Sequence, residues 1–163
     1  MADEINLWDQ LLNLRDQDRD RKAKSITLIK GKDLPLEINK QGNMRWYMHP
    51  LKNDTCIKNM IIYSLEIPPG SKSGKVKYQG GQVIYVWKGQ GYSVLDGVRH
   101  TWKAGDVVQL PLRPRGVIYQ HFNDDDETTA VLVCVEPNTV DALGVDRGSG
   151  FEQLDACPEY KKP

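Results

Sequence analysis

Short apolar runs separated by turn signals are the feature of this sequence that most constrains its fold. Glycine, proline or aspartate occurs in nearly every break between the runs, and Asp96-Gly97 predicts a two-residue hairpin because glycine accepts a positive φ. The runs are "ITLIK", "MRWYMH", "NMIIYSLEI", "QVIYVWK", "YSVLD", "VVQLP", "GVIYQHF" and "AVLVCVE", all within residues 26–137. Many short strands at this spacing predict an all-β sandwich or barrel.

The two ends of the chain differ from this β-rich middle. Residues 3–15 place Ile5, Trp8, Leu11 and Leu12 at helical spacing, which predicts an amphipathic α-helix, and the charged stretch that follows is interpreted as a solvated helix end or linker. We therefore expect a helix and charged linker over 1–25, the barrel over 26–137, and a polar C-terminal tail over 138–163. The tail is expected to hold one short helical turn and a loosely held end.

Composition indicates which classes of partner and which cellular compartment to expect. The 163 residues suit one domain, and 22 Lys plus Arg balance 22 Asp plus Glu, so the chain lacks the basic field that nucleic-acid binding needs. The apolar runs are too short to cross a membrane, and the acidic N-terminus is unlike a secretory signal, so we expect a cytoplasmic protein. Of three widely spaced cysteines, we expect Cys56 and Cys134 to fill strand interiors and Cys157 to be exposed.

The glycines and prolines form a pattern with two halves. The N-terminal half is Pro69-Gly70, five residues, Val76, one residue, Tyr78, three residues, Gln82, six residues, Gly89. The C-terminal half is Gly105-Asp106, four residues, Pro111, then Pro114-Arg115-Gly116, two residues, Tyr119, three residues, Asn123. The pattern resembles the two motifs of the cupin superfamily, G-x5-H-x-H-x3,4-E-x6-G and G-x5-P-x-G-x2-H-x3-N, with three extra residues after Pro111. "GYSVLDGVRHTWKAGD" is also similar to the middle of cupins related to gentisate-type ring-cleaving dioxygenases.

The resemblance implies a double-stranded β-helix, that is, a jelly-roll barrel, usually as a dimer. It also implies that the family's four metal-ligand positions are held here by Val76, Tyr78, Gln82 and Tyr119. Valine cannot ligate, glutamine is a neutral and weak ligand, and two phenols without imidazole are a weak set for a divalent transition metal. We therefore expect no metal and no other cofactor.

His121 follows Tyr119 by two residues, so strand alternation places both side chains on one face, toward the lumen. We interpret His49 as an edge or core residue and His100 as a surface residue. Arg113 and Arg115 could attract an anionic ligand at the rim, although loop arginines are more often solvated. The predicted inner face consists of Val76, Tyr78, Gln82, Ile84, Tyr119 and His121.

Three functions are compatible with this inner face. The first is a metal-free module that binds a small anionic or aromatic metabolite. The second is a metal-free acid–base enzyme, of isomerase, cyclase or lyase type, that uses His121 as the proton-transferring residue together with Tyr119 or Tyr78. The third, disfavoured by the ligand set, is a ring-cleaving dioxygenase with unusual ligands such as His49 and His121.

We also expect a homodimer, because an apolar helix stripe needs a surface to cover it. That surface could belong to the helix's own sheet or to a partner's sheet. Trp46 and Met60, on early strands, are candidate interface positions.

Overall fold

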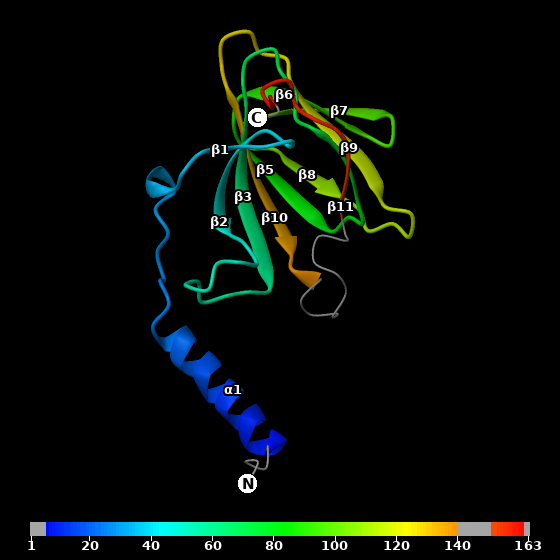
Figure 1. The fold of residues 1–163 in the computed structure, drawn as a ribbon. Helices are drawn as coiled ribbons and strands as arrows, with labels where there is room; N and C mark the ends of the chain where they lie inside the picture. Colours follow the sequence, from blue (N-terminus) through cyan, green and yellow to red (C-terminus); the bar gives the residue numbers. More distant parts are fainter. Residues whose placement is uncertain (1–5, 140–150, 162–163) are drawn as a thin grey trace.

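A computed structural model describes residues 6–139 and 151–161 of the chain, and it shows two antiparallel sheets packed face to face with one helix at the N-terminus (Figure 1). The predicted all-β jelly roll with an N-terminal helix is therefore confirmed. One sheet has the strand order β1-β2-β3-β10-β5-β8 and the other β11-β4-β9-β6-β7. The elements are α1 (Leu7–Ala23), a 3-10 turn (Gly31–Asp33), β1 (Glu37–Ile38), β2 (Asn43–Met48), β3 (Met60–Ile67), β4 (Lys75–Tyr78), β5 (Gln82–Lys88), β6 (Gln90–Leu95), β7 (Val98–Lys103), β8 (Val107–Leu110), β9 (Val117–Asn123), β10 (Ala130–Pro137) and β11 (Phe151–Asp155).

The strand pattern follows the turn chemistry of the sequence. Asp96 and Gly97 have φ values of 47° and 87° and join β6 to β7, so the predicted two-residue hairpin is confirmed. Gly91 is required for a different reason: a Cβ at this position would lie 2.0 Å from the carbonyl oxygen of Phe122 on the neighbouring strand β9. The first predicted run, 26–30, is not a strand, because Ile26 makes only one isolated bridge, to Thr55.

The core fills the space between the two sheets. In β10, alternate residues are buried from Ala130 to Glu136, and β5 buries Gln82, Ile84 and Val86 in the same way. This period of two is the signature of strands with one face toward a core and one toward solvent. Inward-facing side chains from both sheets thus meet in one layer, and the candidate site lies within it.

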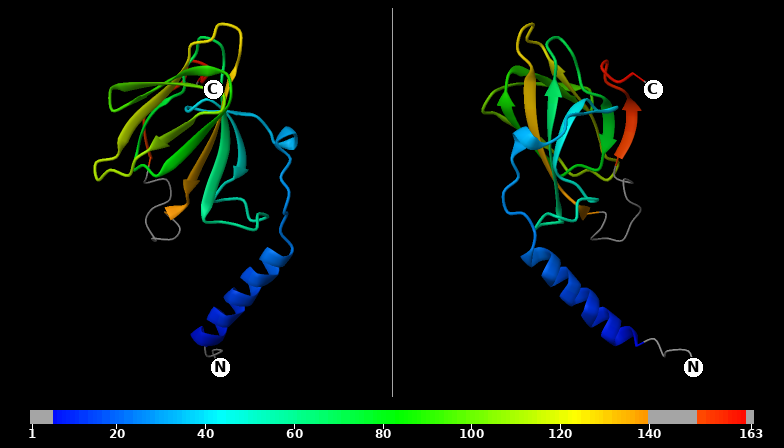
Figure 2. Two further views of the ribbon diagram at one scale, coloured as in Figure 1. Left: turned by 180° about the vertical axis from the view of Figure 1, so that it is seen from behind. Right: turned by 60° about the vertical axis from the view of Figure 1, so that its left-hand side comes forward.

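Helix α1 extends away from the sandwich and does not lie on its own sheet (Figures 1 and 2). It begins after Asn6, whose side chain accepts a hydrogen bond from the Asp9 N–H, and it continues through the charged stretch to Ala23. Salt bridges from Asp18 to Arg21 (3.0 Å) and Lys22 (2.9 Å) stabilise this second half, which was expected to be a helix end or linker. Of the predicted apolar stripe, Trp8 (67%) and Leu11 (56%) are exposed, Leu12 is half-buried, and Ile5 lies outside the described residues.

The C-terminal segment is more ordered than its polar sequence suggested. Phe151–Asp155 forms β11, which pairs with β4 at the edge of the five-stranded sheet, where a loosely held end was expected. Cys157 is buried and donates to the Asn39 carbonyl, so its predicted exposure is wrong. Cys134 is buried in β10 as predicted, whereas Cys56 is exposed outside the strands, contrary to prediction. Within the described ranges, no helix is both long and apolar enough to span a membrane.

Candidate ligand-binding site

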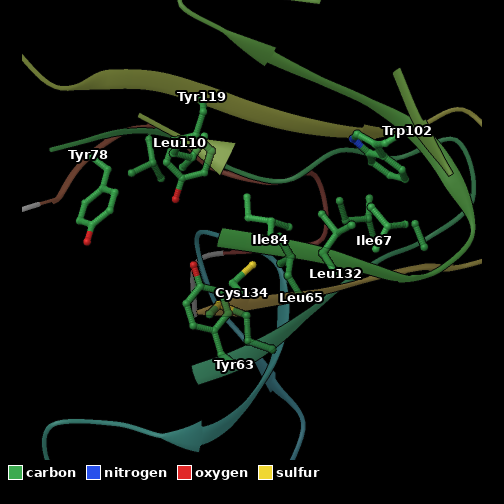
Figure 3. Packing of buried hydrophobic residues seen from close by; sticks show 14 residues of the cluster. Tyr63, Leu65, Ile67, Tyr78, Ile84, Trp102, Leu110, Tyr119, Leu132 and Cys134 are labelled. Carbon is green, nitrogen blue, oxygen red and sulfur yellow. The ribbon is translucent and has the colours of Figure 1, made fainter. Parts of the chain in front are cut away.

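A cavity of about 760 Å³ opens between the two sheets on the side where β2 and β3 face β4 and β9. Figure 3 shows the phenols of Tyr63 and Tyr119 reaching into the space between the sheets from opposite sides. The cavity is of a size common for small-molecule sites. Its lining residues are Asn39, Lys40, Gln41, Met44, Trp46, His49, Pro50, Leu51, Ile61, Tyr63, Val76, Tyr119, Glu136, Asn138, Phe151, Gln153 and Tyr160.

Aromatic rings form much of the cavity wall. Trp46 lies edge-on to His49, with ring centroids 4.8 Å apart, and 5.0 Å from the ring of Tyr63. On the opposite sheet, Phe151 of β11 stacks on Tyr78 at 4.5 Å. Trp46, a candidate interface residue from its sequence position, therefore lies in the cavity wall. The alternation of β2 turns this side chain toward the second sheet.

A buried carboxyl group lies at the inner part of the cavity. Glu136 on β10 is 1% exposed, and its Oε2 accepts a 2.6 Å hydrogen bond from Nε2 of Gln82 on β5. The same Nε2 donates to the Tyr63 hydroxyl at 2.9 Å. Burial raises the pKa of Glu136 to about 7, and the Gln82 hydrogen bond opposes this shift in part. Glu136 can therefore exchange a proton near neutral pH.

Gln82 is suited to both protonation states of Glu136. In the orientation found, the amide nitrogen donates to the carboxylate, and Oε1 is buried without a hydrogen-bond partner among the described residues. A 180° rotation of the amide would present Oε1 to the hydroxyl of Tyr63 and to a protonated Glu136. The orientation found, with the amide nitrogen toward Glu136 and Oε1 unpaired, is therefore the one that suits an ionised Glu136.

The four residues that the sequence resemblance assigns to the family's metal-ligand positions are all on strands of the sandwich core. Val76 of β4 and Tyr119 of β9 are direct register partners, and Val76, Tyr78, Gln82 and Tyr119 are all buried. Burial raises the pKa of both Tyr78 and Tyr119 well above the ordinary value. Valine has no donor atom, the glutamine amide is neutral, and two phenols without imidazole are a weak ligand set. These residues do not fit a divalent transition metal. Across 6–139 and 151–161, no three His, Cys, Asp or Glu side chains are grouped to hold one.

His121 belongs to a separate buried cluster. It is 1% exposed, and its Nδ1 lies 2.7 Å from Oγ of Ser93, which also accepts a 2.9 Å hydrogen bond from the indole N–H of Trp102. Burial lowers the pKa of His121 to about 4, so the ring is neutral at pH 7 and Nδ1 can accept the Ser93 proton. Its side chain is buried, as expected, but His121 is not among the residues that line the cavity.

The predicted rim arginines lie elsewhere. Arg113 pairs with Asp96 beside a second cavity of about 710 Å³, and Arg115 is exposed and lines neither cavity. Gln82 and the exposed His100 also border that second cavity. The other predicted inner-face residues divide in two groups: Val76 and Tyr119 line the first cavity, and Tyr78 and Ile84 are buried without lining it.

Two residues of the site, Glu136 and Tyr63, were not among the sequence candidates. Both lie on buried strands where a period of two was visible: Glu136 continues the inward series of Leu132 and Cys134, and Tyr63 begins that of Leu65. A carboxyl at an inward position of an apolar strand was therefore a signal that the sequence contained.

Comparison with known protein families gives the same fold as the structure. Residues 63–136 match the family described as Cupin domain. This stretch is a cupin domain. No curated protein matches the chain closely enough to count as a relative. The solved structures that resemble the cupin domain and its flanking residues include the polyketide cyclase RemF from Streptomyces resistomycificus, at 17% identity and a TM-score of 0.57 over 69% of this chain and 79% of that one.

Two further structures show the same fold. A Cupin 2 conserved barrel domain protein from Salinispora arenicola is 25% identical, with a TM-score of 0.52 over 74% of this chain and 95% of that one. A salicylate 1,2-dioxygenase from Pseudaminobacter salicylatoxidans is 16% identical, with a TM-score of 0.56 over 86% of this chain and 37% of that one. At such identities the likeness to the cyclase and the dioxygenase establishes a common fold for the cupin domain, not a common substrate.

Proposed function

We propose that this cupin domain binds a small aromatic molecule in its lumen without a metal ion. The observation that carries the proposal is the cavity of about 760 Å³, whose wall includes Trp46, Tyr63, Tyr119 and Phe151 and whose inner part contains Glu136. Apolar and aromatic walls with few polar groups are the usual composition of small-molecule sites.

Of the two ligand classes suggested by the sequence, the geometry favours an aromatic ligand over an anion. Arg113 is paired with Asp96 at the second cavity, and Arg115 does not line the first. An anion in the lumen would approach Glu136, and like charges in a low-dielectric site repel strongly. Lys40, at an exposed position, is the only lysine or arginine among the described lining residues.

Trp46 provides a direct test of lumen binding. Titration with an aromatic probe such as phenol is expected to change the fluorescence of the wild-type protein and of Trp87→Phe, because Trp87 is exposed on β5 outside the cavity. The change should be lost in Trp46→Phe. Amide resonances of residues 63, 76 and 119 should shift during the same titration. Shifts confined to residues outside the cavity would contradict the proposal.

Acid–base catalysis is the second candidate function, and the observation that favours it is a cavity carboxyl with a pKa of about 7. In this version the proton-transferring residue is Glu136, not His121. As base, Glu136 would take a proton from a carbon next to a carbonyl and then return a proton from solvent. Acetophenone in D₂O tests this step by proton NMR: the α-protons should exchange faster with wild-type protein than with Glu136→Gln. Equal rates would exclude Glu136 as the base.

The absence of a bound metal is a separate element of the proposal. It is supported by the chemistry of Val76, Tyr78, Gln82 and Tyr119, which offers no imidazole and no carboxylate at the family positions. Elemental analysis of untagged protein is expected to give far less than one iron, manganese, nickel or zinc per chain. A stoichiometric metal that is lost in Tyr119→Phe would contradict it.

A homodimer completes the proposal. Two apolar surfaces support it: the stripe of α1 and the outer face of β5 and β8, where Trp87 (67%) and Val107 (53%) are exposed. Helix α1 points away from the sandwich and does not cover β5 or β8 (Figure 2). A second copy would cover such surfaces, and two-fold pairs are the commonest assemblies. Light scattering at micromolar concentration should give twice the chain mass of 18.5 kDa, and a monomer mass would contradict it.

A further inference from the structure

Glu136 is a buried carboxyl group that has no positively charged partner within residues 6–139 and 151–161. No salt bridge among the described residues includes it, and its hydrogen bond comes from the neutral amide of Gln82. Removing a carboxylate from water costs several kcal/mol unless a positive charge and hydrogen bonds compensate. One neutral donor compensates for this cost only in part. A positive charge placed beside Glu136 would therefore stabilise its ionised form.

The aromatic walls around this carboxyl group also favour a positively charged ligand. Trp46 and Tyr63 approach from β2 and β3, Tyr119 from β9, and Phe151 and Tyr160 from the C-terminal segment. The faces of aromatic rings carry partial negative charge and attract cations, and this attraction grows when the cation is desolvated. A carboxylate and several rings around one cavity form a typical cage for an organic cation.

We propose that the lumen takes a small organic cation with apolar substituents, an alkylated or aromatic ammonium, with Glu136 as its counter-ion. This inference rests on the proposed binding function and specifies the ligand class. Glu136 must ionise to act as counter-ion. When a permanently charged cation enters a site in which Glu136 is protonated, one proton therefore leaves to solvent.

Phenyltrimethylammonium and tert-butylbenzene are the probes that test it, because they have the same shape and differ in charge. Calorimetry at pH 8 is expected to show at least tenfold tighter binding of the cation. Since the probe does not titrate and the carboxyl pKa is about 7, its affinity should fall about tenfold from pH 8 to pH 6. Calorimetry at pH 6 in buffers of different ionisation enthalpy should detect the released proton.

Other titratable groups near Glu136 do not account for this pH dependence. Its neighbours are the phenols of Tyr63 (β3), Tyr78 (β4) and Tyr119 (β9) and the thiol of Cys134 (β10), and burial raises the pKa of each well above its ordinary value. Lys40 and His49 also line the cavity, and burial lowers the pKa of His49. His49→Gln separates the two groups: a pH dependence of cation binding that disappears in this variant would assign it to His49 and overturn the role of Glu136.

Glu136→Gln is the decisive variant. It should abolish both the preference for the cation and the pH dependence, and it should still bind tert-butylbenzene, which also shows that the lumen is intact. Glu66→Gln is the matched control, because Glu66 is a β3 carboxylate that pairs with Arg45 (2.9 Å) and does not line the cavity. Its binding should equal that of the wild type.

The outcomes separate this inference from the proposed function. If tert-butylbenzene shifts the cavity resonances but the cation binds no tighter, or binds equally well to Glu136→Gln, the inference is overturned and lumen binding stands. If neither probe nor phenol perturbs the amide resonances of residues 63, 76 or 119, the proposed function fails, and the inference fails with it.

Discussion

The sandwich holds two buried polar clusters that differ in their relation to the cavities. In the His121 cluster, Ser93 links the imidazole to the indole of Trp102 within 2.9 Å, and His121 lines neither cavity. In the Glu136 cluster, Gln82 connects a carboxyl to the Tyr63 phenol, one amide oxygen has no partner among the described residues, and the carboxyl lines a cavity. A polar network enclosed by side chains helps to specify a core, whereas a network that lines a cavity and contains an unpaired oxygen is a candidate for ligand binding.

The largest expected effect is on the His121 cluster. Ser93→Ala removes the one oxygen that meets both the Trp102 N–H and His121 Nδ1, and each buried group left unpaired costs about 1–3 kcal/mol. We expect the free energy of unfolding, measured in urea, to fall by about 4 kcal/mol. Ser64→Ala is the control, since Ser64 is buried on β3 and shows no side-chain hydrogen bond to a described residue. Equal losses in both variants would mean that the linkage through Ser93 contributes nothing.

The two clusters should also respond to pH with opposite sign. Glu136 has a folded-state pKa of about 7 against an ordinary 4.5, so the folded state retains a proton that the unfolded state releases. The stability of the wild type relative to Glu136→Gln should therefore fall by roughly 3 kcal/mol as the pH rises from 4.5 to 7 and stay level above. Urea unfolding at several pH values measures this. A flat difference would show that Glu136 is not buried as an acid.

For His121 the direction is reversed. Its folded-state pKa of about 4 lies below the ordinary 6.5, so the unfolded state binds a proton that the folded state excludes. The wild type relative to His121→Asn should lose roughly 3 kcal/mol as the pH falls from 6.5 to 4. Asparagine keeps an acceptor close to the place of Nδ1. His100→Gln, at an exposed position on β7, should show no such trend, and a similar trend there would remove the assignment to His121.

The smallest expected effect is within the Glu136 cluster. Tyr63→Phe removes the acceptor of one of the two hydrogens on Gln82 Nε2, whose other hydrogen still donates to Glu136, so a single buried donor is left unpaired. We expect a loss of about 2 kcal/mol in unfolding free energy, because one unpaired buried donor costs about 1–3 kcal/mol. A loss as large as that of Ser93→Ala would mean that the two clusters contribute equally to stability, and the contrast between them would not hold.

The sequence by itself determined seven of the strands, namely β2, β3, β5, β6, β8, β9 and β10, and the period of two that sets the side to which their residues point. The period of two in "QVIYVWK" and "AVLVCVE" is fixed by local geometry, so Gln82, Ile84 and Leu132 face inward as the pattern indicates. The Asp96-Gly97 turn is equally local, because it depends on the φ preferences of two residues. The same rule, applied to the end of the last run, would have placed Glu136 inside.

Only the tertiary structure decided which inward residues meet. Gln82 and Glu136 are 54 positions apart, and they form a pair because β10 lies between β3 and β5 in the sheet. Similarly, Ser93 reaches His121 across the β6–β9 register, which withdraws the imidazole from the cavity. Strand order and register arise from contacts distant along the chain, and local propensity carries no information about them. The position of α1 relative to the sandwich also depends on tertiary contacts. Its apolar positions indicate a helix, but they do not indicate which surface, if any, it packs against.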